Sequence, residues 1–283
     1  MKGTFLKQMG LFVLFLACSL AVFLFGPNYY RLFPTNGNAF YAGGLSAVLL
    51  VAALLLKRSL KLSNYWQIAY AFFVASAVNL VSSLFAGYNT SILRFFGTST
   101  GENAGIALAK LYDSILVIIP ILLLTWASGV DLGSIFLKRG VNKKWGLGIG
   151  ALVFFNFLTS ALIFFGTGYE ISKLGAVLLW GIIFAFSNSL LEELWIRGIF
   201  LKKLVPLIGT VGTVILTSTW FAVLHFLGVA YLPASVVPIF VVNTFTLGLA
   251  CSILMLKTDS IWGAFLLHAA ADLFLFIAIL AIH

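Results

Sequence analysis

The chain has 283 residues, of which 62% are hydrophobic and 9% are charged. Its mean hydropathy of +1.11 leaves too little polar surface for a water-soluble globular domain, so the sequence predicts a polytopic membrane protein. The net charge of +9 comes from basic residues scattered among short connections, which is typical of membrane topology and not of a nucleic-acid surface. We therefore expect membrane lipids, and no nucleic acid, among its partners.

Nine apolar stretches are long enough to cross ~30 Å of hydrocarbon, a distance that takes about 20 helical residues. In chain order they cover residues 10–26, 39–56, 66–87, 108–128, 146–166, 176–203, 210–230, 234–256 and 261–282. We expect helices because lipid cannot satisfy exposed backbone groups and no alternating pattern is present. The predicted fold class is all-α, a polytopic transmembrane helix bundle that forms a single integral membrane domain over residues 1–283.

The lysines and arginines predict the orientation of these spans. Thirteen of the 17 fall in alternate connections that face the cytosol if the N-terminus does. These are Lys2, Lys7, Lys57, Arg58, Lys61, Lys138, Arg139, Lys143, Lys144, Arg197, Lys202, Lys203 and Lys257. The outer side keeps Arg31, Arg94, Lys110 and Lys173. Because basic residues concentrate in cytoplasmic connections, we expect nine spans with the N-terminus inside and the C-terminus outside.

Five ionisable residues lie deep inside the apolar stretches of the C-terminal third, at Glu192, Glu193, His225, His268 and Asp272. Such groups are costly at membrane depth, so they usually pair with one another and mark functional sites. Glu193 and Arg197 are four residues apart and can pair on one helix face, while Glu192 is rotated by about 100° toward another group. A helix-end charge cluster is the simpler alternative, but Lys202 and Lys203 are better interfacial anchors.

Two chemistries fit these residues. A glutamate and a histidine that share a water can activate it for attack on a carbonyl, while a second histidine with Asp272 binds that carbonyl or stabilises the oxyanion. This would be peptide hydrolysis inside the membrane. Alternatively, Glu192, His225 and His268 could hold zinc with one position open for water. The sequence has no HExxH or other compact zinc motif, so we expect no cofactor and keep zinc as the alternative.

Three motifs follow one another in separate apolar stretches: EExxxR at 192–197, FxxxH at 221–225 and HxxxD at 268–272. In this order they resemble the CPBP family, which comprises the type II CAAX prenyl endopeptidases and their bacterial bacteriocin-processing and immunity relatives. The resemblance covers about residues 175–276, which we expect to be the catalytic core, and leaves 1–174 as variable N-terminal spans. It also implies a multi-pass protein in the cell membrane of a prokaryote.

The resemblance implies a role for each of seven residues. The expected catalytic residues are Glu192, His225, His268 and Asp272, and the expected supporting residues are Glu193, Arg197 and Asn243. Glu192 and His225 would activate the water, and His268 with Asp272 would face the carbonyl oxygen. An ionised Asp272 would repel an oxyanion, so it should be protonated or should orient His268. Asn243 would line the site or hydrogen-bond a neighbouring helix.

The expected function is an intramembrane endopeptidase that cuts a membrane-associated or lipidated protein or peptide near the cytosolic face. One alternative is a non-catalytic membrane immunity or scaffold protein of the same family that acts by binding a partner. A proton-coupled transporter would also place such residues in the membrane, but neither inverted repeats nor broken helices are evident in the sequence. The substrate, its prenylation and the oligomeric state stay open at this level.

Overall fold

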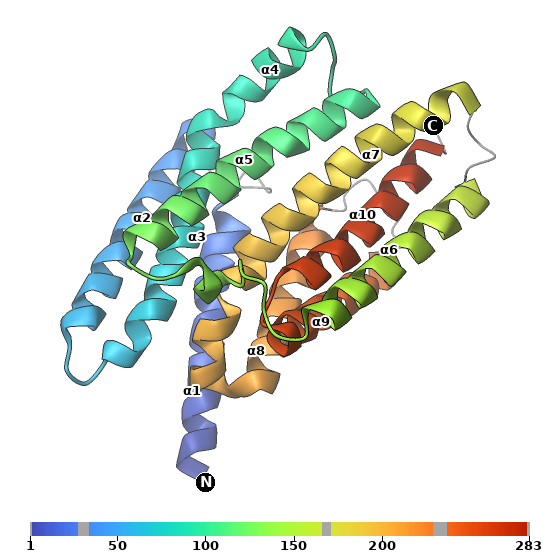
Figure 1. Cartoon of the computed structure of the whole chain (residues 1–283). Helices are drawn as coiled ribbons and strands as arrows, with labels where there is room; N and C mark the ends of the chain where they lie inside the picture. The colour runs from blue at the N-terminus through green and yellow to red at the C-terminus, as the bar shows by residue number, and fades with distance from the viewer. Residues whose placement is uncertain (1, 28–33, 166–170, 229–236, 282–283) are drawn as a thin grey trace.

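The computed structural model of the chain is a bundle of helices (Figure 1), with no strand in the residues that it describes, 2–27, 34–165, 171–228 and 237–281. In chain order the helices are α1 (Lys2–Ser19), α2 (Thr35–Arg58), α3 (Trp66–Phe85), the short α4 (Asn89–Phe95), α5 (Asn103–Ala127), α6 (Lys143–Phe165), α7 (Ile171–Glu192), α8 (Leu201–Gly228), α9 (Val237–Thr258) and α10 (Trp262–Ala281). The predicted all-α class is confirmed.

Seven of the described helices are long and apolar enough to cross a membrane. Large hydrophobic side chains such as Phe40, Leu55 and Trp126 are exposed on their outward faces, as expected of a surface that contacts lipid. Two further apolar helices, Lys144–Thr159 and Trp262–Ile277, are shorter within the described residues. The chain is thus an integral membrane protein, whereas nine spans and their orientation stay predictions. Outside the described residues lie Arg31 and the predicted span positions 166, 229–230, 234–236 and 282.

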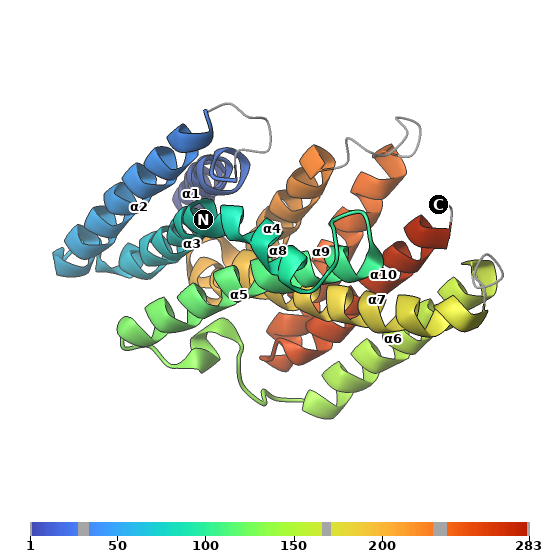
Figure 2. The ribbon, with the colours of Figure 1, turned by 90° about the horizontal axis from the view of Figure 1, so that it is seen from above.

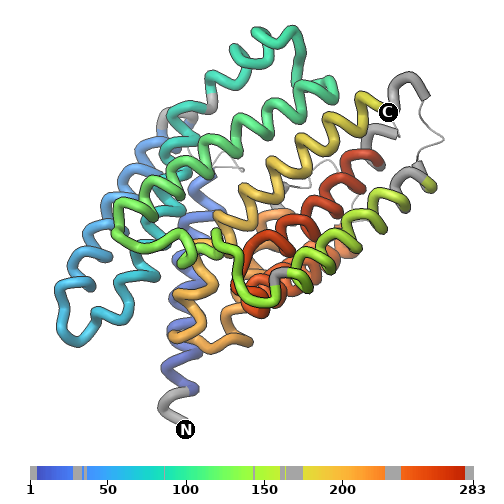
Figure 3. The backbone as a smooth tube through the Cα atoms, viewed as in Figure 1, coloured from blue at the N-terminus to red at the C-terminus, as the bar shows by residue number. Residues whose placement is uncertain are grey.

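The helices that carry the three motifs meet in the interior of the bundle. Helices α2 and α3 pack together on one side and α6 packs against α10 on the other, as the view from above shows (Figure 2). Between them α7 contacts both α5 and α10, and α8 packs against α1 and α9. The backbone trace in Figure 3 begins at one end of the bundle with α1 and finishes at the opposite end with α10. Helix α7 thus lies beside α10, α9 packs between α8 and α10, and α8 contacts the residues that follow α7.

Two of these helices differ from the predicted spans 176–203 and 210–230. Helix α7 gives way at Glu193–Gly198 to a π-helix, and Lys202 and Lys203 lie in the first turn of α8 instead of ending the preceding span. Ile199 and Phe200, which connect the π-helix to α8, are apolar and buried. Hydropathy alone therefore does not reveal that α8 begins after them. Helix α8 is interrupted at Gly209, whose φ of 74° lies in the left-handed region that glycine adopts without strain.

Candidate active site

The first motif lies where α7 changes from an α-helix to a π-helix. The amide of Ile199 donates to the Leu194 carbonyl at 3.1 Å, five residues earlier, which is the wider spacing of a π-turn. Such turns are rare and frequently occur at functional sites, because they redirect side chains within an otherwise regular helix. Here the π-helix begins at Glu193, directly after Glu192, so the two adjacent carboxylates lie at a break in helical geometry.

Glu193 joins the first motif to the third. Its Oε1 atom contacts Arg197 Nη1 and lies 2.8 Å from His268 Nδ1, and all three side chains are almost completely buried. A carboxylate oxygen accepts hydrogen bonds only, so Nδ1 of His268 is the donor in this contact. The Nε2 atom on the other side of the imidazole therefore faces Glu192 and Asp272.

Glu192 lies between the two histidines. Its Oε2 atom is 3.7 Å from His225 Nε2 and 3.6 Å from His268 Nε2, and it has no hydrogen-bond partner among the described residues. The Nδ1 atom of His225 lies 2.8 Å from the Phe221 carbonyl, which can only accept, so Nδ1 carries the proton and Nε2 presents a lone pair toward Glu192. Both gaps exceed a direct hydrogen bond, so Glu192 Oε2 keeps a free lone pair to which a water beside the histidines can donate.

Asp272 contacts a residue that the sequence motifs did not single out. The amide Nδ2 of Asn188 donates to Asp272 Oδ2 at 3.0 Å, and both residues are buried. In contrast, Asp272 Oδ1 is 3.7 Å from His268 Nε2, which is too long for a hydrogen bond. Asn188 lies four residues before Glu192 and so shares its helix face, but a neutral amide in a membrane helix gives no sequence signal of this role.

Phe221, the first residue of the second motif, packs against three members of the cluster. The Arg197 guanidinium lies 4.4 Å from the centre of its ring, the His225 ring lies 4.2 Å away, and the His268 ring meets it edge-on at 5.3 Å. The phenyl ring is fully buried, so it excludes water from this side of the cluster. The FxxxH spacing thus places a hydrophobic wall one helical turn before His225.

Asn243 is not brought to the cluster. It is exposed on α9 and forms no hydrogen bond to a motif residue within the described part of the chain. The buried face of α9 instead presents Gly248 and Cys251, and the Cys251 thiol donates to the Ala264 carbonyl of α10 at 3.7 Å. Cys251 is not among the residues predicted from the sequence, because a lone cysteine in an apolar run gives no signal of a functional role.

A cavity of about 260 Å³ reaches Glu192. Trp195 of the π-helix lines it together with Lys110 and Asp113 of α5, both of which are half-buried. Further polar lining comes from Asn38, Asn79, Ser82 and Ser83. Lys110 lies on a segment that the charge bias assigns to the outer half of the membrane, whereas the sequence led us to expect cleavage near the cytosolic face.

A metal site was the alternative for these residues. Within the described ranges, no three His, Cys, Asp or Glu side chains have a geometry that would hold a metal ion. His268 Nδ1 is engaged by Glu193, and Glu192 reaches both histidines through a single oxygen. The zinc alternative stays a prediction, and no step below depends on a metal.

All three motifs fall within one region of similarity to known proteins. Residues 174–274 match the family model of the type II CAAX prenyl endopeptidases, Rce1-like. The resemblance inferred from the motifs is thereby confirmed over this region, which runs from α7 into α10. The match indicates a membrane protease of the CAAX type. Comparison with curated proteins and with solved structures gives no match. The assignment of residues 1–174 to variable spans stays a prediction.

Proposed function

We propose that this protein is an intramembrane endopeptidase that hydrolyses a peptide bond of a membrane-associated or lipidated protein or peptide. The observation that carries the proposal is the position of Glu192 Oε2, 3.6 and 3.7 Å from two histidine Nε2 atoms, at the end of a polar cavity. A water held by Glu192 and His225 donates to two acceptors at once. Either group can then take its proton as the oxygen attacks the substrate carbonyl.

His268 and Asp272 form the carbonyl side in this mechanism. As an imidazolium, His268 donates from Nδ1 to Glu193 and from Nε2 to the developing oxyanion. Asp272 acts as a neutral acid: Oδ2 accepts from Asn188, and Oδ1 carries the proton. The peptide C–N bond then breaks, and the proton removed from the water passes to the leaving amine. We propose no cofactor for these steps.

The support for a membrane-bound substrate is the position of the cluster. Glu192 lies inside the apolar helical segment Gly175–Gly198, so a soluble peptide would have to leave water to reach it. A lipid anchor or a hydrophobic segment of the substrate would compensate for that transfer. We place the protein in the cell membrane of a prokaryote, with lipids and lipidated or membrane-associated proteins as its partners.

The test compares cells that carry the wild-type chain with cells that carry Glu192→Gln, which keeps the side chain's shape but removes the base. Glu102→Gln, in an exposed connection, is the matched control. Proteomics of the membrane fraction should find a protein that is shortened in wild-type and Glu102→Gln cells but accumulates uncut with Glu192→Gln. We expect cleavage to fall at least ~100-fold, the scale of general-base catalysis.

Cleavage that continues undiminished in Glu192→Gln would refute the proposed mechanism. A phenotype that persists in this variant without any cleaved protein would favour the binding or immunity function. The same cleavage assay, run with a metal chelator on purified protein and substrate, separates the zinc alternative, because zinc dependence predicts a loss of activity that added zinc restores.

A further inference from the structure

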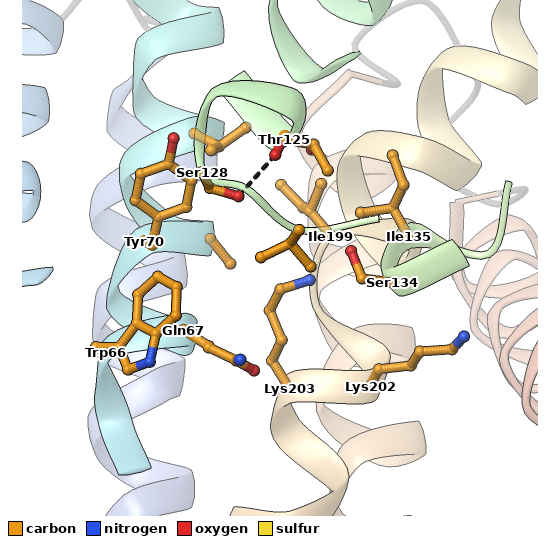
Figure 4. A pocket seen from close by; sticks show the side chains of 13 residues that line it. Trp66, Gln67, Tyr70, Thr125, Ser128, Ser134, Ile135, Ile199, Lys202 and Lys203 are labelled. Atoms are coloured by element: carbon orange, nitrogen blue, oxygen red, sulfur yellow. Dashed lines mark hydrogen bonds between the residues drawn. The ribbon is translucent and has the colours of Figure 1, made fainter. Parts of the chain in front are cut away.

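A second, smaller cavity lies between α3, the end of α5 and the beginning of α8, away from Glu192 (Figure 4). Its volume is about 70 Å³, several times the space that one water needs. Trp66 and Tyr70 of α3 form one wall, and the connection that follows α5 forms another. None of the residues of the proposed catalytic cluster lines this cavity.

Lys203 places a buried amine in this cavity, and no acidic side chain among the described residues pairs with it. Its Nζ atom is inaccessible to solvent and has no hydrogen-bond partner in the described residues. The Ser134 hydroxyl on the facing wall is likewise inaccessible and has no hydrogen-bond partner among these residues. Figure 4 shows the Lys203 side chain extending into the cavity, with Lys202 turned away from it. A buried ammonium that lacks a counter-charge is strongly destabilising, so this site calls for an anion.

The neighbouring carboxylates are already engaged elsewhere. Asp259 Oδ1 lies 2.5 Å from Lys202 Nζ, and its other oxygen contacts Lys138. Asp131 accepts from the Gly133 amide at 2.9 Å, as the cap of a short helical turn. The anion that Lys203 lacks must therefore come from outside this part of the chain.

The lining and the location both point to a phosphate group. An ammonium and a hydroxyl on facing walls offer several donors to one tetrahedral oxyanion, and the aromatic wall is typical of a membrane interface. The charge bias assigns the beginning of α8, which carries Lys203, to the cytosolic side, and basic pockets between membrane helices at this level bind lipid head groups. We propose that this cavity binds the phosphate of an anionic phospholipid or of a soluble phosphate.

The experiment measures thermal unfolding of the full chain in a maltoside detergent without phosphate, by tryptophan fluorescence. Phosphatidylglycerol and inorganic phosphate are the two probes. We expect phosphatidylglycerol to raise the wild-type Tm by about 3 °C or more. In Lys203→Met the rise should disappear, because the charge that binds the phosphate is lost. Without either probe, this variant should be at least as stable as the wild type, since it no longer buries an unpaired ammonium.

Lys202→Met is the matched control: it should begin at a lower Tm, because Lys202 pairs with Asp259, yet keep the full rise. Ser134→Ala should keep the fold and lose part of the rise, so the test survives if Lys203→Met fails to fold. A rise with the lipid alone assigns the phosphate to a head group, and an equal Lys203-dependent rise with inorganic phosphate assigns it to a soluble anion. No rise in the wild type, or an equal rise in Lys203→Met, overturns the proposal.

Discussion

Glu193 holds the buried network together, because one of its oxygens contacts Arg197 from one side and His268 from the other. Both charged side chains are fully buried, and removing one partner of such a pair leaves an uncompensated charge, which costs about 3–5 kcal/mol. An ion pair in this position orients more than it stabilises. It fixes the His268 ring so that Nε2 faces the space beside Glu192, where the proposed chemistry takes place.

The contact between Asn188 and Asp272 gives a prediction at the residue scale. Asn188→Ala removes the only hydrogen bond to Asp272 found among the described residues, so the proposed acid loses its orientation. We expect turnover of the substrate found by proteomics to fall about tenfold, the kinetic equivalent of one hydrogen bond. Proteolysis by purified protein, with kcat and KM determined separately, measures the effect.

Asn79→Ala is the control for this prediction. Asn79 is likewise a buried asparagine in a membrane helix, and it donates to the Val22 carbonyl at 2.7 Å. This variant should lower Tm. Because Asn79 lines the cavity that leads to Glu192 but does not contact Asp272, any loss of activity should appear in KM while kcat stays unchanged. If Asn188→Ala behaves in the same way, Asn188 is a packing residue and not a positioning residue for Asp272.

Charge made part of the candidate site predictable from the sequence. Glu192, Glu193, His225, His268 and Asp272 stand out because ionisable groups are rare and costly in apolar helices. Asn188 and Cys251 do not, since a neutral amide or thiol has ordinary packing and hydrogen-bonding roles in a membrane helix. The partner of Asp272 was also unpredictable, because helical spacing suggested His268 and only the packing of α7 against α10 brings Asn188 closer.

At the scale of elements, helical periodicity located the long helices but not the break between α7 and α8. Hydropathy does not distinguish a π-helix from an α-helix. The predicted span 176–203 therefore joined the π-helix Glu193–Gly198 and the beginning of α8 to α7. Glycine is the one local signal that remained, and Gly209 does interrupt α8 where the sequence placed a connection. Boundaries set by tertiary packing cannot be predicted from composition alone.

The junction of α9 and α10 gives a prediction for pH dependence. Asp259 lies in the left-handed region, with φ of 51°, and pairs with both Lys138 and Lys202. Partial burial raises the pKa of Asp259, but its contacts with the two ammonium groups outweigh this, so the pKa lies below its ordinary value. Such a group stabilises the fold above its unfolded pKa of about 3.9, and this contribution is lost as the pH falls through the lower folded pKa.

Asp259→Asn isolates this contribution, because asparagine also tolerates the left-handed backbone. We expect a lower Tm than the wild type between about pH 5 and pH 7, and a difference that shrinks below about pH 4, where the aspartate takes up its proton. Thermal unfolding of both proteins in detergent, from pH 7 to below pH 4, measures this difference in Tm. A difference in Tm that stays constant from neutral to acid pH would mean that the two ion pairs do not stabilise the junction.

At the scale of the whole molecule, the side of the membrane to which the Glu192 cavity opens depends on the orientation of the chain in the membrane. The cavity that reaches Glu192 is lined by Lys110 and Asp113, in the half of the bundle where α5 begins. If the N-terminus is cytosolic, as the charge bias predicts, this half faces outward, and water and substrate enter from the outer side. In the reverse orientation the same cavity opens toward the cytosol.

Single cysteines decide between the two orientations. In a Cys18→Ser, Cys251→Ala background, Leu62→Cys tests the exposed turn between α2 and α3, and Thr100→Cys tests the exposed connection before α5. We expect a membrane-impermeant maleimide to label Thr100→Cys in intact cells and Leu62→Cys after permeabilisation, because basic connections stay in the cytosol. The reverse labelling would overturn the predicted orientation and turn the Glu192 cavity toward the cytosol, where the sequence led us to expect cleavage.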